Sequence, residues 1–330
     1  MNRLLRYIPA PFELLRNHAN VNPLIINYHV VSNKHLPHIS QLYPYRDVKQ
    51  FIDDLDFLLA NFYPINLENL LESSKNNTKL PVNSFLITFD DGFKEIYDIV
   101  MPIMMKKKIM PVIFMTTDYI DNKILGNDQK KSLIIEEIKK NKKSEYKTKK
   151  LLNVNDQNQN ELVKSILKIP YHEKDILDMI AGKLDIDFNK ILENNKPYLT
   201  SEQIKKLMGI GFSFGSHSID HPYFAELSLE EQINQTIASM NYICNNFEIN
   251  YRVFAFPYWD GKISLEYFER ISNDVDLTFG TQGLIDDPVK TNFQRISVEK
   301  YSYKAKNTIK SHYIRKLVYK LFSKDSLIRS

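Results

Sequence analysis

Two adjacent carboxylates and a pair of histidines are the residues in this sequence whose types and spacing could bind a metal ion. Asp90 and Asp91 end an apolar, strand-like run at residues 84–89 and are followed by Gly92. Successive side chains leaving a strand point in different directions, so one carboxylate can bind a metal while the other stays free as a base. The alternative is a simple turn, because Asp-Gly is a common turn pair.

His217 and His221 form the second segment, and Pro222 follows them directly. At a spacing of four residues, both histidines can face one ion across a helical turn, which the proline would end. Taken alone they could be two surface histidines. Together with one aspartate they make three nitrogen and oxygen ligands with an open position, which suits a catalytic Zn²⁺ or a similar ion.

A third segment, residues 254–259, is an apolar run that ends in Pro-Tyr-Trp. Pro257 restricts the backbone, so the turn can present the Tyr258 N–H to an oxyanion. The rings of Tyr258 and Trp259 could stack on a sugar. The alternative is an apolar strand that ends at a proline.

The elements that must position these segments alternate between strands and helices. We expect helices at residues 48–62, 97–107 and 229–247, and strands at residues 24–31, 84–89, 111–116, 212–216, 253–257, 277–280 and 294–298. Alternation of this kind predicts an α/β fold with a parallel sheet or barrel. In such folds the loops at the carboxyl ends of the strands hold the active site.

A segment rich in Lys and Asn interrupts this alternation. Its apolar residues keep helical spacing, but they thin out near residues 141–160, where we expect a mobile centre. We divide the chain into an N-terminal arm (1–23), a barrel (24–121 and 197–303), a helical insertion (122–196) and a basic amphipathic tail (304–330). The tail predicts either a helix packed on the barrel or a peripheral contact with an anionic membrane.

The composition is that of an ordinary globular protein, with 43% hydrophobic and 25% charged residues among 330. The formal net charge of +4 is mild, and we expect no nucleic-acid partner, since such proteins concentrate far more positive charge. No signal peptide is evident, and no apolar run approaches the ~18 residues that span a bilayer. We therefore expect a cytoplasmic protein, with the membrane contact of the tail as its only membrane association.

In this order, the three segments resemble the motifs of the polysaccharide deacetylases, carbohydrate esterase family 4. The family motifs Thr-Phe-Asp-Asp-Gly and His-[Ser/Thr]-x-x-His match residues 88–92 and 217–221, and the Pro-Tyr of its third motif matches residues 257–258. The resemblance covers roughly residues 24–116 and 199–298. It implies a distorted (β/α) barrel and a hydrolase that removes an acyl group, N-acetyl in particular, from a sugar.

The resemblance also implies a role for each matched residue. Asp91, His217 and His221 would hold a divalent metal, with zinc as the expected ion, and Asp90 would be the general base. The Tyr258 N–H would stabilise the oxyanion. The implied partner is an acetylated carbohydrate, which we expect to be a cell-surface polysaccharide or its precursor.

Two features of the family are missing. Its third motif usually has an arginine two residues before the proline, where this chain has Ala255, and we predict that Arg295 on the last strand replaces it. A surface ion pair is the alternative role for Arg295. The C-terminal Leu-x-His that often supplies the general acid is also absent. We predict that His29, near the end of the first strand, supplies the acid instead, as in the branch active on poly-N-acetylglucosamine; a structural histidine is the alternative.

Two other functions stay open. Residues 211–215 match the Gly-x-Ser-x-Gly motif of serine hydrolases, but Ser213 lies inside an expected strand that no helix directly follows. The substitution at Ala255 would also fit a catalytically impaired protein that only binds carbohydrate. The intact aspartates and histidines of the first two motifs argue against that interpretation.

Overall fold

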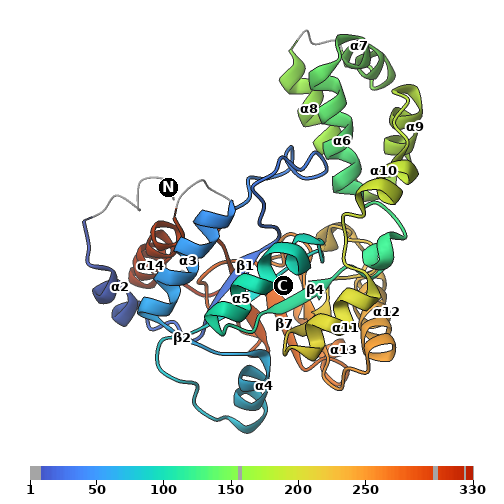
Figure 1. The fold of residues 1–330 in the computed structure, drawn as a ribbon. Coiled ribbons are helices and arrows are strands. Elements are labelled where there is room, and N and C mark those ends of the chain that lie inside the picture. Colours follow the sequence, from blue (N-terminus) through green and yellow to red (C-terminus); the bar gives the residue numbers. More distant parts are fainter. Residues whose placement is uncertain (1–8, 155–157, 300–303, 323–324, 330) are drawn as a thin grey trace.

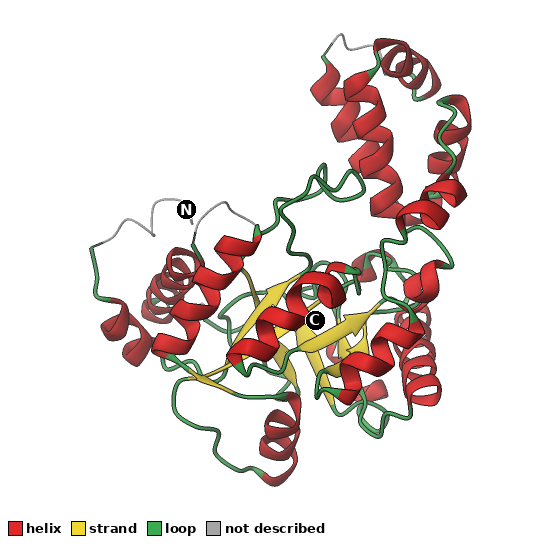
Figure 2. Ribbon diagram, in the orientation of Figure 1, coloured by secondary structure: helices red, strands yellow, loops and turns green. Residues whose placement is uncertain are grey.

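The computed structural model describes residues 9–154, 158–299, 304–322 and 325–329, and parallel strands form its centre. The sheet runs in the order β8-β7-β6-β5-β4-β3-β1-β9, with β2 beside β3. Its strands are β1 (Leu24–Tyr28), β2 (Tyr63–Pro64), β3 (Ser84–Phe89), β4 (Val112–Met115), β5 (Ser213–Ser216), β6 (Val253–Ala255), β7 (Leu277–Gly280), β8 (Asn292–Gln294) and β9 (Ile296–Ser297). Helices surround these strands in Figure 2.

The sheet nearly closes into a barrel because one short stretch of chain pairs with both of its ends. Residues of β8 pair with β7, whereas Ile296 and Ser297 of β9 pair with β1. Arg295 lies between the two strands and marks the change of partner. The predicted (β/α) barrel is therefore confirmed. The single strand expected at residues 294–298 is wrong, since the chain must turn there from one neighbour to the other.

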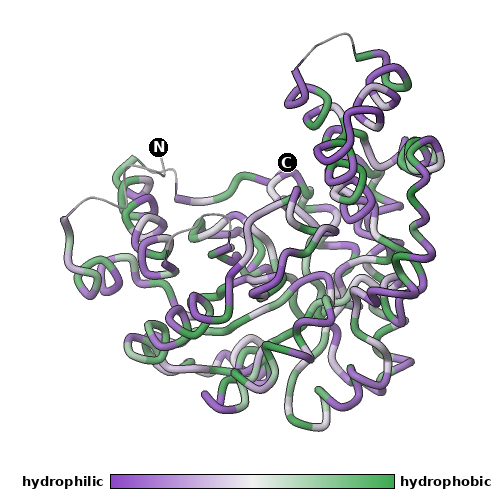
Figure 3. Tube along the Cα trace, turned by 45° about the horizontal axis from the view of Figure 1, so that its top comes forward, coloured by the Kyte–Doolittle hydropathy of each residue, from purple (hydrophilic) through white to green (hydrophobic). Residues whose placement is uncertain are grey.

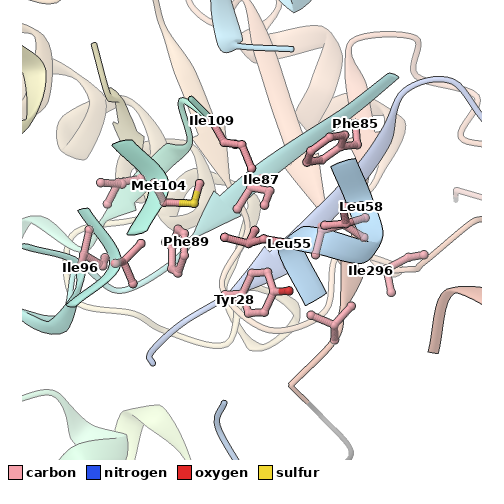
Figure 4. Close-up of a cluster of buried hydrophobic side chains, with 14 of the residues drawn as sticks. Tyr28, Leu55, Leu58, Phe85, Ile87, Phe89, Ile96, Met104, Ile109 and Ile296 are labelled. Carbon is pink, nitrogen blue, oxygen red and sulfur yellow. The ribbon is translucent and has the colours of Figure 1, made fainter. Parts of the chain in front are cut away.

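Side chains on the two faces of the strands form separate cores. On β1, Tyr28 and Ile26 pack outward with Leu55 and Leu58 of α3 (Val48–Asn61), as Figure 4 shows in part. Ile25 instead belongs to the apolar interior of the barrel, together with residues of β3, β4, β6 and β7. This alternation is the period of two that a pleated strand imposes. Asn27 is two residues after Ile25 and therefore also points into the barrel. It places a polar group above the apolar side chains of the interior.

Further helices cover the outside of the barrel: α2 (Phe12–Ala19), α4 (Leu67–Asn76), α5 (Met101–Lys107), α11 (Ser201–Gly209), α12 (Leu229–Phe247), α13 (Leu265–Ile271) and α14 (Ala305–Leu321). Several begin with a capping box, in which the N-cap side chain and the third helical residue satisfy each other's backbone N–H; α3, α4, α11 and α12 share this feature. These caps fix where the helices start.

The Lys- and Asn-rich segment is helical and stands out from the barrel in Figure 1. It contains α6 (Asn127–Lys140), α7 (Lys142–Leu151), α8 (Gln159–Leu167), α9 (Asp175–Lys183) and α10 (Phe188–Asn195). Hydrophilic and hydrophobic positions interleave along it in Figure 3, and the hydrophobic ones form a buried cluster of their own. The centre expected to be mobile, at residues 141–160, contains α7, whose Glu145 pairs with Lys142 and Lys149. Residues 155–157 of this centre lie outside the described residues, and over residues 142–151 the scarcity of apolar residues did not prevent a helix.

The loop between β1 and α3 fastens this insertion to the barrel. Val30, Leu36 and Ile39 of the loop belong to the insertion's hydrophobic cluster. Polar contacts add to this packing, because Ser132 of α6 donates to the Pro37 carbonyl at 2.6 Å. The first helix of the insertion is therefore held against this loop.

The tail helix α14 packs on the barrel. Ile309 and Tyr313 are fully buried in the main core, and the Asp54 carboxylate accepts a hydrogen bond of 2.7 Å from the Ala305 N–H at the start of the helix. Most of its apolar face is thus occupied, while Leu321 and Phe322 at its end are exposed. Membrane contact through the tail stays a prediction. Within the described ranges, no helix has the length and hydrophobicity needed to cross a membrane.

A buried ion cluster ties the end of the chain to the barrel. The Arg329 guanidinium donates to Asp260 Oδ2 at 2.7 Å and to Asp287 Oδ2 at 2.6 Å. The three side chains are 0%, 0% and 4% exposed, respectively. Asp260 follows Trp259 directly, so this cluster also supports the loop of the third motif.

Replacing Arg329 should therefore be costly. We expect Arg329→Met to lower the free energy of unfolding by ~3–5 kcal/mol, because it leaves two buried carboxylates without a counter-charge. Urea unfolding followed by circular dichroism measures the change. Lys49→Met is the matched control, since Lys49 pairs with Asp53 on the surface and its loss should change stability little. Equal effects of the two substitutions would show that the Arg329 cluster does not hold the fold together.

Candidate metal centre and active site

The three predicted metal ligands meet at one edge of the barrel. Asp91 follows β3, and His217 and His221 follow β5. The Nε2 atoms of His217 and His221 lie 3.5 Å and 3.4 Å from Asp91 Oδ1. All three ligand atoms lie within 4.8 Å of one another. A single ion could contact all of them, so the residues are placed as the motifs predict.

The strand order explains why these residues converge. Only β4 separates β3 from β5, and the three strands are parallel, so their carboxyl ends share one edge. At the end of β3, Asp91 and Gly92 both have left-handed backbones, with φ of 69° and 72°. A Cβ atom at Gly92 would overlap the Met115 side chain. The Asp-Gly pair is thus a tight turn and a source of a ligand at once.

The expected helical turn between the two histidines is wrong. Residues 217–221 form a loop in which Ser218 and His221 have positive φ values of 70° and 63°. Backbone bonds from Thr117 to the Ser218 carbonyl and from Asp118 to the Ile219 carbonyl hold this loop. Left-handed residues fold the chain back on itself, and they bring the two imidazoles together in place of a helix.

The donor set suits a cation. The Nδ1–H of His217 donates to the Ala255 carbonyl at 2.8 Å, which leaves the Nε2 lone pair directed at Asp91. Burial lowers the pKa of His217 to about 4, so the imidazole is neutral at pH 7. Asp91 Oδ1 is buried and has no hydrogen-bond partner within the described residues. A buried carboxylate oxygen without a donor, beside two imidazole nitrogens, is the environment that a bound divalent ion would complete.

Asp90 lies beside this centre and makes a two-pronged pair with Arg295. The guanidinium donates to Asp90 Oδ1 at 2.7 Å and to Oδ2 at 3.0 Å, and Asn27 Nδ2 adds a bond of 3.0 Å to Oδ2. Burial alone would raise the pKa of Asp90, but the charges of Arg295, His217 and His29 and the hydrogen bond from Arg295 together outweigh it and hold the pKa at about 2. Arg295 is only 1% exposed, so the alternative of a surface ion pair is wrong.

Asn27 is a site residue that the motifs did not point to. Its Oδ1 accepts bonds from Thr88 Oγ1 at 3.0 Å and from Arg295 Nη1 at 3.1 Å. It therefore fixes both the carboxylate and the guanidinium of the neighbouring pair. An asparagine inside the otherwise apolar strand at residues 24–28 was the available signal.

His29, the predicted acid, is held by a residue that the sequence analysis missed. Its N–H and its Nδ1–H both donate to Glu299 Oε2 at 2.8 Å, and the Val30 N–H donates to Oε1 at 3.2 Å. Burial by itself would lower the pKa of His29, but the hydrogen bond and charge of Glu299 outweigh it and raise the pKa to about 9. The imidazole is therefore protonated at pH 7. The sequence signal for Glu299 was an acidic residue directly after the strand expected at residues 294–298.

These residues line one cavity of about 500 Å³. Tyr258 and Trp259 are 42% and 39% exposed at its rim, and Tyr258 has a left-handed backbone with φ of 55°. No acceptor bonds the Tyr258 N–H within the part of the chain that the structure describes. Of the predicted residues, the cavity brings together His29, Asp90, Asp91, His217, His221, Tyr258 and Trp259, while Arg295 lies behind Asp90.

The serine-hydrolase alternative finds no support in this geometry. Ser213 lies within β5, and the chain continues from this strand into the loop at residues 217–221. A nucleophile elbow needs a sharp turn at the serine that leads directly into a helix. The strand places Ser213 in the barrel wall instead.

The sequence model for polysaccharide deacetylases matches residues 77–278, and the chain belongs to this family. It is accordingly a hydrolase of the class that deacetylates carbohydrates. No curated protein sequence matches the chain.

Solved structures agree with the fold. The chain is similar to the Streptococcus pyogenes deacetylase PplD, solved with acetate (14% identity, TM-score 0.55, covering 87% of this chain and 96% of PplD). It is also similar to IcaB from Ammonifex degensii (15%, 0.55, 88% and 96%) and to a de-N-acetylase from Aggregatibacter actinomycetemcomitans (12%, 0.55, 88% and 99%). At identities this low, the structural similarity shows a shared fold and nothing more.

The metal centre gives a direct prediction. His217→Ala should remove most of the bound zinc, because one of three converging ligands is lost. Zinc content is measured after dialysis against one equivalent of the ion, with circular dichroism to show that the variant folds. His172→Ala is the control, since the His172 side chain is 73% exposed and does not line the cavity. Full zinc occupancy in His217→Ala would exclude His217 as a ligand.

Proposed function

We propose that this protein is a metal-dependent N-deacetylase that acts on an N-acetylated sugar of a cell-surface polysaccharide or its precursor. One observation carries the proposal. The three candidate ligands and an Asp90 that is held ionised by Arg295 converge in a single cavity. The same cavity contains a protonated histidine and two exposed aromatic rings.

Asp91, His217 and His221 are the residues that would hold the ion, and two nitrogens with one carboxylate oxygen match the preference of zinc. When bound, such an ion supplies Lewis acidity toward an amide carbonyl and lowers the pKa of a water molecule. The neutral state of His217 and the free Oδ1 of Asp91 support this assignment.

Asp90 is the proposed general base. Its pKa of about 2 keeps the carboxylate ionised throughout the neutral range, so it can accept a proton from the attacking water. Arg295 and Asn27 fix its orientation through three hydrogen bonds. Asp90 Oδ2 lies 4.0 Å from His217 Nε2, which places the base next to the ligands.

His29 is the proposed general acid, and Tyr258 and Trp259 complete the site. Protonated His29 can donate to the departing nitrogen, which must be protonated because an amide anion is a very poor leaving group. The Tyr258 N–H can donate to the oxyanion that forms on the carbonyl oxygen when water attacks the carbonyl carbon. The two exposed rings supply apolar faces for the sugar.

A second candidate, a protein that binds carbohydrate without catalysis, rests on Ala255 alone. Arg295 supplies a guanidinium to Asp90, as the arginine of the third motif does in the family. The substitution at Ala255 is therefore weak support for a loss of catalysis. Release of acetate from N-acetylglucosamine and its oligomers, with zinc and with a chelator, separates the two functions. Acetate release that the chelator abolishes is expected, and sugar binding without any turnover would favour the second candidate.

Asp90 should be essential for turnover but not for metal binding. We expect Asp90→Asn to keep its zinc and to lose at least ~10²-fold in the rate of acetate release, because an amide cannot accept the proton. Asp53→Asn, on the exposed side of α3, is the control and should keep full activity. Near-normal turnover of Asp90→Asn would place the base elsewhere.

His29 should matter only where the leaving group needs a proton. His29→Ala is expected to retain fold and zinc, to lose at least ~10²-fold in amide hydrolysis, and to lose far less on an activated aryl acetate. Equal losses on both substrates would contradict an acid role. The pH profile gives a second readout, because activity requires the protonated imidazole and should fall as pH rises through the pKa of His29.

Glu299→Gln tests the cause of that pKa. Glu299 raises the pKa of His29, so removing its charge should lower it and move the falling limb of the pH profile to lower pH. The amide of Gln keeps a hydrogen-bond acceptor, which controls for ring orientation. An unchanged basic limb would show that another group gives rise to it.

A further inference from the structure

A second cavity, of about 380 Å³, adjoins the cavity of the metal centre. The two have four lining residues in common, which form the wall between them: Asp128, Leu167, His221 and Tyr258. Two of the four come from the barrel loops and two from the insertion. The rest of the second cavity is lined largely by the insertion, from α6 and from the segment between α8 and α9.

We propose that this second cavity binds the neighbouring sugar of an oligosaccharide chain, and that the insertion at residues 122–196 thereby selects a substrate of at least two sugars. The inference rests on the proposed deacetylase function and adds a second subsite to it. Volumes of this size are in the range of ligand-binding pockets, ~300–1,000 Å³.

Aromatic rings run from the metal centre into the second cavity. The His221 and Tyr258 ring centroids are 4.6 Å apart, and Tyr258 and Tyr223 follow at 5.6 Å in an edge-to-face contact. Tyr223 lines the second cavity only. Leu167, 38% exposed at the end of α8, adds an apolar surface from the insertion. A chain of sugar rings that leaves the metal centre would pass along these side chains.

The polar groups of the cavity fit neutral sugar hydroxyls better than an anion. Lys131 lies 3.5 Å from Asp128 Oδ1, and Lys174 donates to Asp220 Oδ2 at 2.9 Å. Both of these lysines are thus already paired with a carboxylate, and Lys168 and Glu226 add one charge of each sign to the lining. The cavity presents donors and acceptors side by side, which suits hydroxyl groups, since each hydroxyl both donates and accepts.

The insertion is fixed where it meets the active site. The Tyr258 hydroxyl donates to Asp128 in the first turn of α6, so the third-motif loop and the insertion are directly bonded. The neighbouring Gln129 is 3% exposed and lines the metal cavity, and its Oε1 has no hydrogen-bond partner among the residues described. Such fixed contacts can discriminate between substrates, which a mobile appendage could not.

The experiment removes side chains that line only the second cavity. Lys131→Ala/Lys168→Ala and, separately, Tyr223→Ala are compared with the wild type on N-acetylglucosamine, on its di- to tetrasaccharides and on an activated aryl acetate. Lys143→Ala/Lys150→Ala is the matched control, because both lysines are exposed on α7 and line neither cavity. Zinc content is measured for every variant.

We expect the wild type to prefer the oligomers over the monosaccharide in kcat/KM. Both cavity variants should lower kcat/KM for the oligomers by at least ~10-fold, mainly through KM, and leave the aryl acetate and zinc content unchanged. The control should match the wild type. A wild type that hydrolyses monosaccharide and oligomers equally well, or cavity variants that keep the preference, would overturn the second subsite.

Failure of the proposed function itself has a different signature, since the zinc-loaded wild type would then release no acetate from any sugar. In that case calorimetric binding of the tetrasaccharide to the zinc-loaded protein decides the matter. Binding that weakens at least ~10-fold in the two cavity variants, but not in the control, supports the subsite. Binding that is the same in all variants, or absent from the wild type, overturns it.

Discussion

The buried pair between Arg295 and Asp90 is the interaction on which both the barrel and its site depend. Arg295 lies between β8, which pairs with β7, and β9, which pairs with β1. Its guanidinium crosses the interior of the barrel to the Asp90 carboxylate at the end of β3. Two charges with 0% and 3% exposed side chains are stable there only together, because either one alone would be a buried charge without a partner. Closure of the barrel therefore brings the guanidinium to the carboxylate, and the pair in turn favours closure.

This pair also explains how the chain departs from the family's third motif and still has a guanidinium beside Asp90. Position 255 on β6 contributes only an alanine to the barrel interior, and the arginine reaches Asp90 from the β8–β9 junction. The backbone of Ala255 keeps a function of its own, since its carbonyl orients His217. What the proposed base requires is a guanidinium at one point in space, and more than one strand of a closed barrel can supply it.

Much of this architecture could be predicted from local pattern, and the remainder depends on long-range contacts. Apolar strands alternating with helices indicate the barrel, and the aspartate and histidine motifs indicate the convergence of ligands. The loop at residues 217–221 could not be predicted, because its left-handed residues are Ser218 and His221, which carry no glycine signal. Nor could the partners Glu299 and Asp128, which lie 270 and 130 residues from His29 and Tyr258 in the sequence. Asn27 could have been predicted as a site residue, because it is a polar residue in an apolar strand at a position that points into the barrel.

These separate contacts together set the protonation states of the groups in the cavity. Three groups of the cavity have pKa values near 2, 4 and 9, and each has a different main cause: Arg295 for Asp90, burial for His217 and Glu299 for His29. At pH 7 the proposed base is ionised, the proposed ligand is neutral and the proposed acid is protonated. Divergent pKa values in one site are the pattern expected where one group must accept a proton and another must donate it. The charge of Asp91 contributes to the raised pKa of His29, after the larger contributions of Glu299, so an ion bound at Asp91 would act to lower that pKa. In the proposed mechanism, metal binding and the strength of the acid would thus be coupled through a single carboxylate.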